Sequence, residues 1–202
     1  MSEVDLSIPC PVCGVENQLK MYTYIDEIPY FGEHTQVTVS CRSCGWKQSD
    51  FIPAEEKEPS MHSLIVHNRN HLEARVVRSS SCTIRIPELD LEVSPGADST
   101  GYVSNVEGIF ERFVRIIRLV KHQSIEEEIE EEITALEKME NMLVNHEFLS
   151  PDREITLVLL DPRGHSVISH EDVVFRPLNS EEIEQLPLGP EPPVFSANPS
   201  NP

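Results

Sequence analysis

Four cysteines near the N-terminus carry the clearest chemical signal in this sequence. Cys10 and Cys13 form one CxxC pair, Cys41 and Cys44 form a second, and a glycine follows each pair. Two CxxC turns can bring four thiolates to the corners of a tetrahedron, which is the ligand set of a structural zinc site. Glycine suits the position after each pair, because a tight turn often requires a positive φ there. The sequence therefore predicts one zinc ion bound by these four cysteines.

A closed set of four sulfur ligands limits what the metal can do. Because no coordination position is left for water, we expect the ion to hold the fold without taking part in catalysis. Two disulfides or a redox-active pair are the alternative interpretation. Redox motifs rarely occur as two matched turns, and the first residues lack the basic and apolar regions of a secretory signal. We therefore expect reduced cysteines in a cytoplasmic protein, with the fifth cysteine, Cys82, as a small buried apolar residue.

The remaining chemically active residues form no recognisable catalytic motif. His62, His67 and His71 lie close together in sequence, and the last two have the i, i+4 spacing of ligands on one helix face. No glutamate accompanies them as the general base of a zinc-protease motif. A glycine-rich nucleotide loop and a GxSxG motif are also missing. We expect no enzyme activity, although a second metal equivalent per chain would reopen that question.

The charge of the chain bears on its partners. Its 202 residues include 35 Asp and Glu against 16 Lys and Arg, for a formal net charge of −19. A phosphate backbone requires clustered Lys and Arg, so this balance argues against nucleic acid. A basic protein surface is the more natural partner, unless the charge serves solubility alone. No run of 18 apolar residues is present, so we expect no membrane span.

The elements that must position the cysteines are short strands. Strands at 17–24 and 35–40 would form a zinc ribbon over residues 8–54, a segment too small to fold without a metal. After a charged linker, further strands are predicted at 75–78, 82–86, 89–93, 155–160, 165–169 and 172–176. We expect residues 155–169 to form a β-hairpin around the turn at Asp161–Gly164.

The middle of the chain has helical periodicity. Ser104 and Ser124 each begin a possible capping box, which predicts one helix from Ser104, a turn at residues 121–123 and a second helix from Ser124. From Ile125 to Glu147 there are nine glutamates against one lysine, so one helix of this antiparallel pair is acidic. Strands on both sides of the hairpin, residues 104–149, imply one β-domain over residues 60–186. Residues 187–202 are rich in proline and are expected to be disordered.

Four stretches of the chain match a known family in the expected order. They are Cys10–Gly14 with Ile28–Gly32 and Cys41–Trp46, then Arg78–Gly96, Ser104–Gly108 and Thr156–Ser166. These stretches resemble the ZPR-type zinc-finger family in its single-module form, as found in archaea, and they cover most of residues 8–170. Members usually have Thr-Thr-Val-Glu-Gly where this chain has Ser104–Gly108, and Asn at the position of His165.

The resemblance implies a fold and a role. The implied fold is a zinc ribbon followed by a double-stranded β-helix, which is a jelly-roll-like domain, with the helical hairpin inserted. Family members bind translation elongation factor one-alpha, the GTPase that delivers aminoacyl-tRNA, in its GDP-bound or nucleotide-free form, and assist its folding. The resemblance therefore implies this GTPase as the partner.

Six residues are candidate partner contacts: Tyr30, Phe31, Trp46, Arg78, Glu127 and Glu131. The acidic helix would meet a basic surface of the partner, and charge complementarity would speed association. Trp46 has the alternative role of packing against the zinc-binding turns. The competing functional hypothesis is a zinc ribbon that binds nucleic acid as a transcription or translation factor. Within residues 8–53, however, three cationic side chains stand against five carboxylates.

Overall fold

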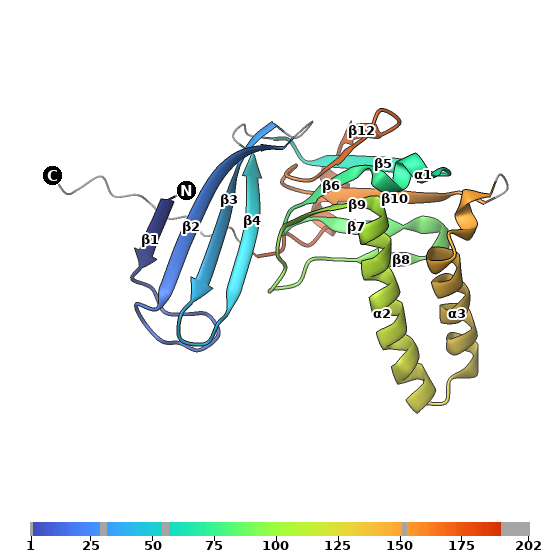
Figure 1. Cartoon of the computed structure of the whole chain (residues 1–202), viewed down its shortest axis with the longest axis horizontal. Helices are drawn as coiled ribbons and strands as arrows, with labels where there is room; N and C mark the ends of the chain where they lie inside the picture. The colour runs from blue at the N-terminus through green and yellow to red at the C-terminus, as the bar shows by residue number, and fades with distance from the viewer. Residues whose placement is uncertain (1, 29–31, 54–56, 151–152, 191–202) are drawn as a thin grey trace.

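The computed structural model describes residues 2–28, 32–53, 57–150 and 153–190. Figure 1 shows two β-domains side by side, with a pair of long helices extending from the larger one. The four cysteines lie in or beside the loops that join strands of the smaller domain. This architecture confirms the mainly β fold with a helical hairpin.

The N-terminal domain is a four-stranded antiparallel sheet whose strands follow chain order. The strands are β1 (Ser2–Leu6), β2 (Leu19–Ile28), β3 (Gly32–Cys41) and β4 (Lys47–Pro53). In β3 the buried positions include Val37, Val39 and Cys41, because alternate side chains of a strand face the same side. The sheet also includes β1, a strand that precedes the expected start of the ribbon at residue 8.

The second domain is a sandwich of two antiparallel sheets. One sheet has the order β12-β5-β10-β7-β8 and the other has the order β11-β6-β9. Their strands are β5 (Ser60–Val66), β6 (Arg75–Arg78), β7 (Thr83–Ile86), β8 (Leu91–Val93), β9 (Tyr102–Asn105), β10 (Ile155–Asp161), β11 (Val167–Ser169) and β12 (Val174–Pro177). Strand β10 pairs with β5 and β7, and β11 pairs with β6, so strands on either side of the hairpin pair as expected.

One turn of the sandwich differs from the sequence prediction. Residues 155–169 do not form a β-hairpin, because β10 and β11 belong to different sheets. The turn after Asp161 carries the chain across the sandwich. The turn itself forms as predicted: the backbone N–H of Gly164 donates to the carbonyl of Asp161, and Gly164 has a φ of +69°. A tight turn of this kind can connect strands of two different sheets as well as neighbouring strands of one sheet.

The inserted hairpin consists of α2 (Val106–Glu126) and α3 (Glu130–Val144). The predicted helix start is one residue off, because the side chain of Asn105 accepts from the N–H of Gly108 and caps α2. The predicted turn at residues 121–123 is wrong. Ser124 is buried within α2, where its hydroxyl donates to the carbonyl of Val120 and to Glu132, so it does not cap a second helix. The reversal comes at residues 127–129, where Glu128 has a left-handed φ of 57°.

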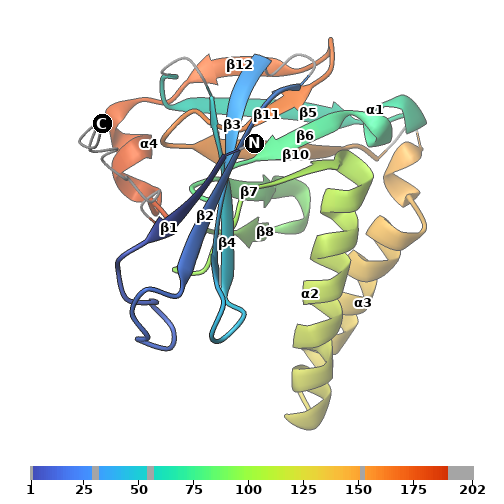
Figure 2. The same cartoon turned by 60° about the vertical axis from the view of Figure 1, so that its left-hand side comes forward.

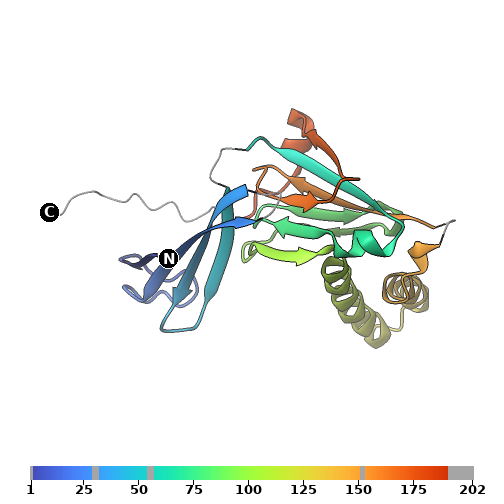
Figure 3. The same ribbon diagram turned by 45° about the horizontal axis from the view of Figure 1, so that its top comes forward.

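The sandwich and the base of α2 share one apolar core. In Figure 3 the helical hairpin lies on one side of the two sheets. Ile109, Phe110 and Phe113 of α2 pack against inward residues of both sheets, such as Leu157 and Val76. The described chain also has two short α-helices, α1 (Arg69–Glu73) after β5 and α4 (Ser180–Gln185) after β12, and two 3-10 helices, η1 (Pro87–Leu89) and η2 (Glu147–Leu149). The core therefore anchors α2 at its base and leaves the far half of the hairpin outside.

A loop of the sandwich that contains three consecutive serines forms the contact with the N-terminal domain. Asp50, a buried residue of β4, accepts hydrogen bonds from the N–H and the hydroxyl of Ser80. From the other side, Asp161 accepts from Ser79 and Ser81, at 2.7 Å each. Phe51 of β4 packs on Val77 and Val167 of the sandwich. The zinc-ribbon sheet is thus fastened to the sandwich by buried polar and apolar contacts together.

The C-terminal end of the described chain also packs on the sandwich. The predicted disordered tail begins at residue 187, but Pro187–Pro190 are described and the carbonyl of Pro190 accepts from Arg163 at 3.0 Å. Gly189 lies so close to the carbonyl of Ser80 that an added Cβ would be 2.5 Å from it. The rest of the predicted tail, residues 191–202, lies outside the described residues. Among the described helices, none has the length and apolar character needed to cross a membrane.

Candidate metal centre

The two CxxC turns have the same backbone geometry. The N–H of Cys10 donates to the carbonyl of Val15, and the N–H of Cys41 donates to that of Trp46 in the same way. In each turn the glycine N–H closes a further bond to the carbonyl of the first cysteine, at 2.9 Å for Gly14 and 3.0 Å for Gly45. Both glycines have a positive φ, +70° and +76°, as the sequence predicted. The two CxxC segments therefore form the same turn in two different loops.

The four sulfur atoms converge between these turns. The Sγ atoms of Cys10 and Cys44 are 3.8 Å apart, and those of Cys13 and Cys41 are 3.7 Å apart. All five cysteines are free thiols, so the two-disulfide alternative does not hold. Four sulfurs at about 2.3 Å from one tetrahedral ion are about 3.8 Å from each other. The separation therefore fits zinc bound by sulfur.

The electrostatics of the four thiols favour a bound cation. Burial raises the pKa of Cys10, but the backbone N–H groups of Cys13 and Val12 donate to its sulfur and bring that pKa down to about 7. The N–H of Trp46 lowers the pKa of Cys44, but burial and the three other sulfurs raise it to about 12. Burial and the neighbouring sulfurs thus oppose a thiolate at Cys44. A divalent cation removes this conflict, because it stabilises all four thiolates at once.

A small apolar cluster supports the metal centre. Leu6, Leu19 and Val39 are buried together with the two inner ligands, Cys10 and Cys41. Trp46 is half-buried and packs against this cluster. This contact matches the packing role left open by the sequence.

The other candidate contact residues differ in where the structure places them. Tyr30 and Phe31 lie outside the described residues. Arg78 is buried, and its guanidinium donates to the hydroxyl of Ser99 and to the carbonyls of Thr100 and Cys82. It therefore supports the loops around it and is not open to a partner, so the structure argues against Arg78 as a partner contact.

The two glutamates that the sequence predicts as partner contacts lie at the exposed end of the hairpin. Glu127 lies in the turn between α2 and α3, where it accepts from Gln123 at 3.1 Å, and Glu131 lies in the first turn of α3. Beside them, Glu128, Glu130 and Glu137 are exposed and form no ion pair among the described residues. The basic residues of α2 neutralise little of this charge, because Arg118 and Lys121 both pair with Glu140.

The histidines noted in the sequence fall into two groups. His62 is buried in β5 against the ring of Phe175, and burial lowers its pKa to about 4 although Asp161 opposes the shift. His67 and His71 come together with His170, at ring-centroid distances of 4.5 and 4.7 Å between neighbours. Asp172 joins them, at 3.0 Å from Nε2 of His71. The sequence does not predict this role of Asp172, because no local pattern links two residues that are 101 positions apart.

Comparison with known proteins agrees with this architecture. The ZPR1 zinc-finger domain model matches residues 3–59 and the ZPR1 jelly-roll domain model matches residues 70–184. A ZPR1-like protein of Pyrococcus horikoshii is 36% identical over 181 residues, which cover 90% of this chain and 80% of that protein. A ZPR1-like protein of Methanocaldococcus jannaschii is 37% identical over 183 residues, 90% of this chain and 89% of its own length. The zinc finger chaperone zpr1 of Schizosaccharomyces pombe is 31% identical over 107 residues, 52% of this chain and 22% of the yeast protein.

Proposed function

This chain belongs to the ZPR1 zinc-finger family, and from that premise we propose that it is a non-enzymatic binding protein that assists the folding of a translation elongation factor one-alpha GTPase. One zinc ion, held by Cys10, Cys13, Cys41 and Cys44, keeps the ribbon rigid. The family resemblance supplies the identity of the partner, and the fission-yeast relative bears the name of a chaperone. A protein with reduced cysteines and this partner works in the cytoplasm.

The observation that carries the proposal is the surface at the free end of the hairpin. Leu119 is 73% exposed and Ile125 is 54% exposed, although both are large apolar residues. The exposed carboxylates described above, including those of Glu127 and Glu131, lie in the same region. Figure 2 shows that this end and the loops of the zinc ribbon extend to the same side of the molecule. A basic client surface with some apolar area would complement it.

The zinc ribbon itself is poorly suited to nucleic acid. Lys20 forms an ion pair with Glu3, and Arg42 forms one with Asp5 at 3.3 Å, so strand β1 neutralises two of the three cations of the ribbon. Only Lys47 is left among them without an ion pair to a described residue. A positively charged groove is the usual requirement for a phosphate backbone, so the balance favours a protein partner.

The test is direct binding of the full chain to elongation factor one-alpha. We expect binding to the GDP-bound and nucleotide-free forms, weaker binding to the GTP form, and slower association at high salt. The double variant E127Q/E131Q should lower affinity by about tenfold, because each exposed charge pair contributes on the order of 0.5–1 kcal/mol.

The matched control is the double variant E181Q/E184Q. It removes the same charge from exposed positions of α4, away from the hairpin. Equal losses in the two variants would refute a specific role for the hairpin end and leave only net charge. Absence of binding in every nucleotide state and at both salt concentrations would refute the proposed function.

A further inference from the structure

A second group of metal-ligating side chains lies in the jelly-roll domain, remote in sequence from the cysteines. One ring nitrogen of His71, one of His170 and one carboxylate oxygen of Asp172 all lie within 4.8 Å of one another. They come from two segments: His71 is in α1, and the other two residues are in the loop between β11 and β12. The jelly-roll fold brings these segments together, because β5 contacts both α1 and β11 in the sandwich.

The distances within this group suit a small cation. Nε2 of His71 is 3.0 Å from Oδ2 of Asp172, and Nδ1 of His170 is 3.7 Å from the same oxygen. A divalent transition metal binds nitrogen and carboxylate oxygen at about 2.0–2.2 Å, which separates neighbouring ligand atoms by about 3.0–3.5 Å. Both measured separations lie within a few tenths of an ångström of this range, so small rotations of the side chains suffice.

Burial distinguishes this group from a chance surface cluster. His71 is only 1% exposed, and a buried imidazole is costly unless both ring nitrogens have partners. The backbone N–H of His67 donates to its Nδ1 over 3.5 Å, so Nε2 carries the ring proton. This Nε2 lies 3.0 Å from Oδ2 of Asp172 and 3.2 Å from the side-chain nitrogen of Asn68. A bound metal ion would take the place of that proton between His71 and Asp172. The backbone of His71 is also held in place, because its N–H donates to the side chain of Asn68.

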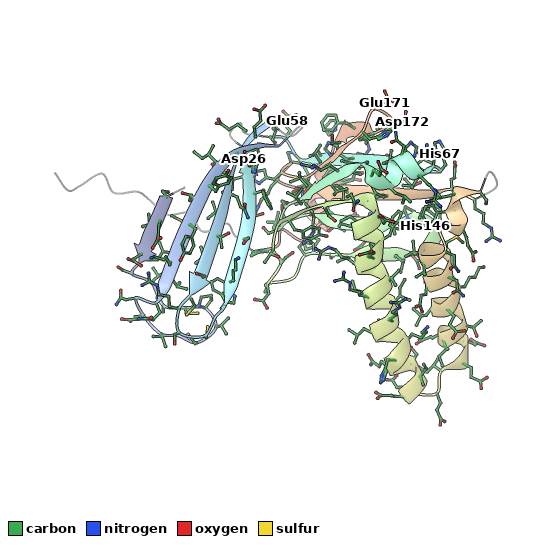
Figure 4. All side chains as sticks on the ribbon, in the orientation of Figure 1. Asp26, Glu58, His67, His146, Glu171 and Asp172 are labelled. Atoms are coloured by element: carbon green, nitrogen blue, oxygen red, sulfur yellow. The ribbon has the colours of Figure 1, made fainter. Side chains whose placement is uncertain are left out.

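One side of the group is open. The side chain of Asp172 is 58% exposed, while that of His170 is 12% exposed. Figure 4 shows His67 and Asp172 at the same end of the jelly-roll domain, away from the zinc ribbon. His67 is exposed and its ring contacts that of His71 edge-on. A cation can therefore enter from solvent, with His67 or water completing its coordination.

We propose that His71, His170 and Asp172 form a second metal site, which binds a divalent transition-metal cation. Two imidazoles and a carboxylate favour zinc, iron(II), cobalt(II) or nickel(II) over the hard cations magnesium and calcium, which prefer oxygen ligands alone. The ion ties the β5–α1 segment to the β11–β12 loop. This assignment is independent of the proposed partner and of the cysteine site.

The test counts metal ions bound to the untagged full chain after equilibration with zinc or cobalt(II) and removal of free metal. We expect two equivalents in the wild-type protein and one in D172N. Asp172 is more than half exposed, so this substitution should fold, and a metal-free unfolding transition of the jelly-roll domain equal to that of the wild type verifies that it has. Cobalt distinguishes the sites, because only the cysteine site adds thiolate-to-metal charge-transfer absorption.

A matched control exists on the hairpin. His122 and Glu126 form an exposed imidazole–carboxylate pair at 3.6 Å, and no third ligand joins them among the described residues. E126Q should keep two equivalents, and H170Q should behave as D172N does. In the wild type the second equivalent should also raise the melting temperature of the jelly-roll domain, and D172N should abolish that rise. A single equivalent in the wild type, or a second one that persists in both D172N and H170Q, would overturn the assignment.

Discussion

The zinc ribbon buries five described residues in its own apolar cluster, and two of these are metal-ligating cysteines, whereas the cluster of the jelly-roll domain contains twenty buried residues. A core as small as that of the ribbon cannot offset the conformational entropy lost on folding. The jelly-roll domain has enough apolar area to fold by burial alone. The comparison indicates that the two domains depend on different interactions, metal coordination in one and the hydrophobic effect in the other.

Metal removal should produce the largest difference in stability between the two domains. Because zinc binding contributes on the order of 10 kcal/mol to a small structural site, we expect chelation or C41S to unfold the ribbon sheet. The jelly-roll domain should keep its cooperative unfolding transition. Hydrogen exchange measured strand by strand tests this: amides of β2 and β3 should lose protection, whereas those of β5 and β10 should retain it.

The reciprocal variant is F110A. Phe110 is 2% exposed in the core beneath α2, and truncation of such a side chain costs about 3–5 kcal/mol. This variant should destabilise the jelly-roll domain and leave the cysteine-bound zinc in place. The comparison would fail if chelation melted both domains together, or if F110A released the metal.

The contact between the domains sets how independent they are. Asp50 accepts from the N–H of Phe51 at 2.9 Å, from the N–H of Ser80 at 3.0 Å and from the hydroxyl of Ser80. In D50A these buried donors lose their acceptor, and each such loss costs about 1–3 kcal/mol. We expect the unfolding transitions of the two domains to separate along the denaturant axis, with a total loss of about 3 kcal/mol.

Asp26 offers a matched control for this prediction. Its side chain accepts from the N–H of the next residue, Glu27, at 2.9 Å, just as Asp50 accepts from Phe51, but it is exposed and has no serine partner. D26A should therefore shift neither transition by more than about 0.5 kcal/mol. Equal effects of D50A and D26A would show that the serine loop does not couple the domains.

The parts of this fold that the sequence predicts are those specified by local pattern. The two CxxC–Gly turns form as expected, because cysteine spacing and a glycine with positive φ are local properties. Strand β6 spans residues 75–78 as predicted, and the helical hairpin has the expected place in the chain. The apolar stripe of α2 faces the core for the same reason, since Ile109, Phe110 and Phe113 repeat at helical spacing.

The parts that the sequence does not predict depend on distant partners. Ser124 resembles a helix cap, yet it is buried inside α2 because Glu132 folds back to accept its hydroxyl. The Ser79–Ser81 loop has no distinctive local pattern, and its role follows from two carboxylates at positions 50 and 161. Asp172 reaches His71 only through the packing of the sandwich. Side-chain pairs of this kind require the tertiary structure.

Acid should affect the two domains through different groups, and a single ion pair between β12 and α4 makes this difference measurable. Glu182 accepts from Arg176 at the start of α4 and from the N–H of Asn179, and these hydrogen bonds lower its pKa to about 2. A depressed pKa in the folded state adds stability above the unfolded value of 4.5, and this stability is lost as the pH falls toward 2. In that window the zinc ribbon also weakens, but by competition of protons with zinc for sulfur.

E182Q should remove only the contribution of the jelly-roll domain to this pH dependence. Its α4 amides should have the same protection factors at pH 6 as those of the wild type have near the low end of the window, whereas β2 and β3 should respond to acid as in the wild type. E181Q, at an exposed neighbouring position that forms no ion pair with any described residue, should change neither. The effect is the smallest of the three, because the Arg176–Glu182 pair lies near the surface and water screens it. If E182Q altered the acid response of the ribbon strands as well, α4 would be coupled to the metal centre, and the separation of the two domains into metal-dependent and burial-dependent parts would be wrong.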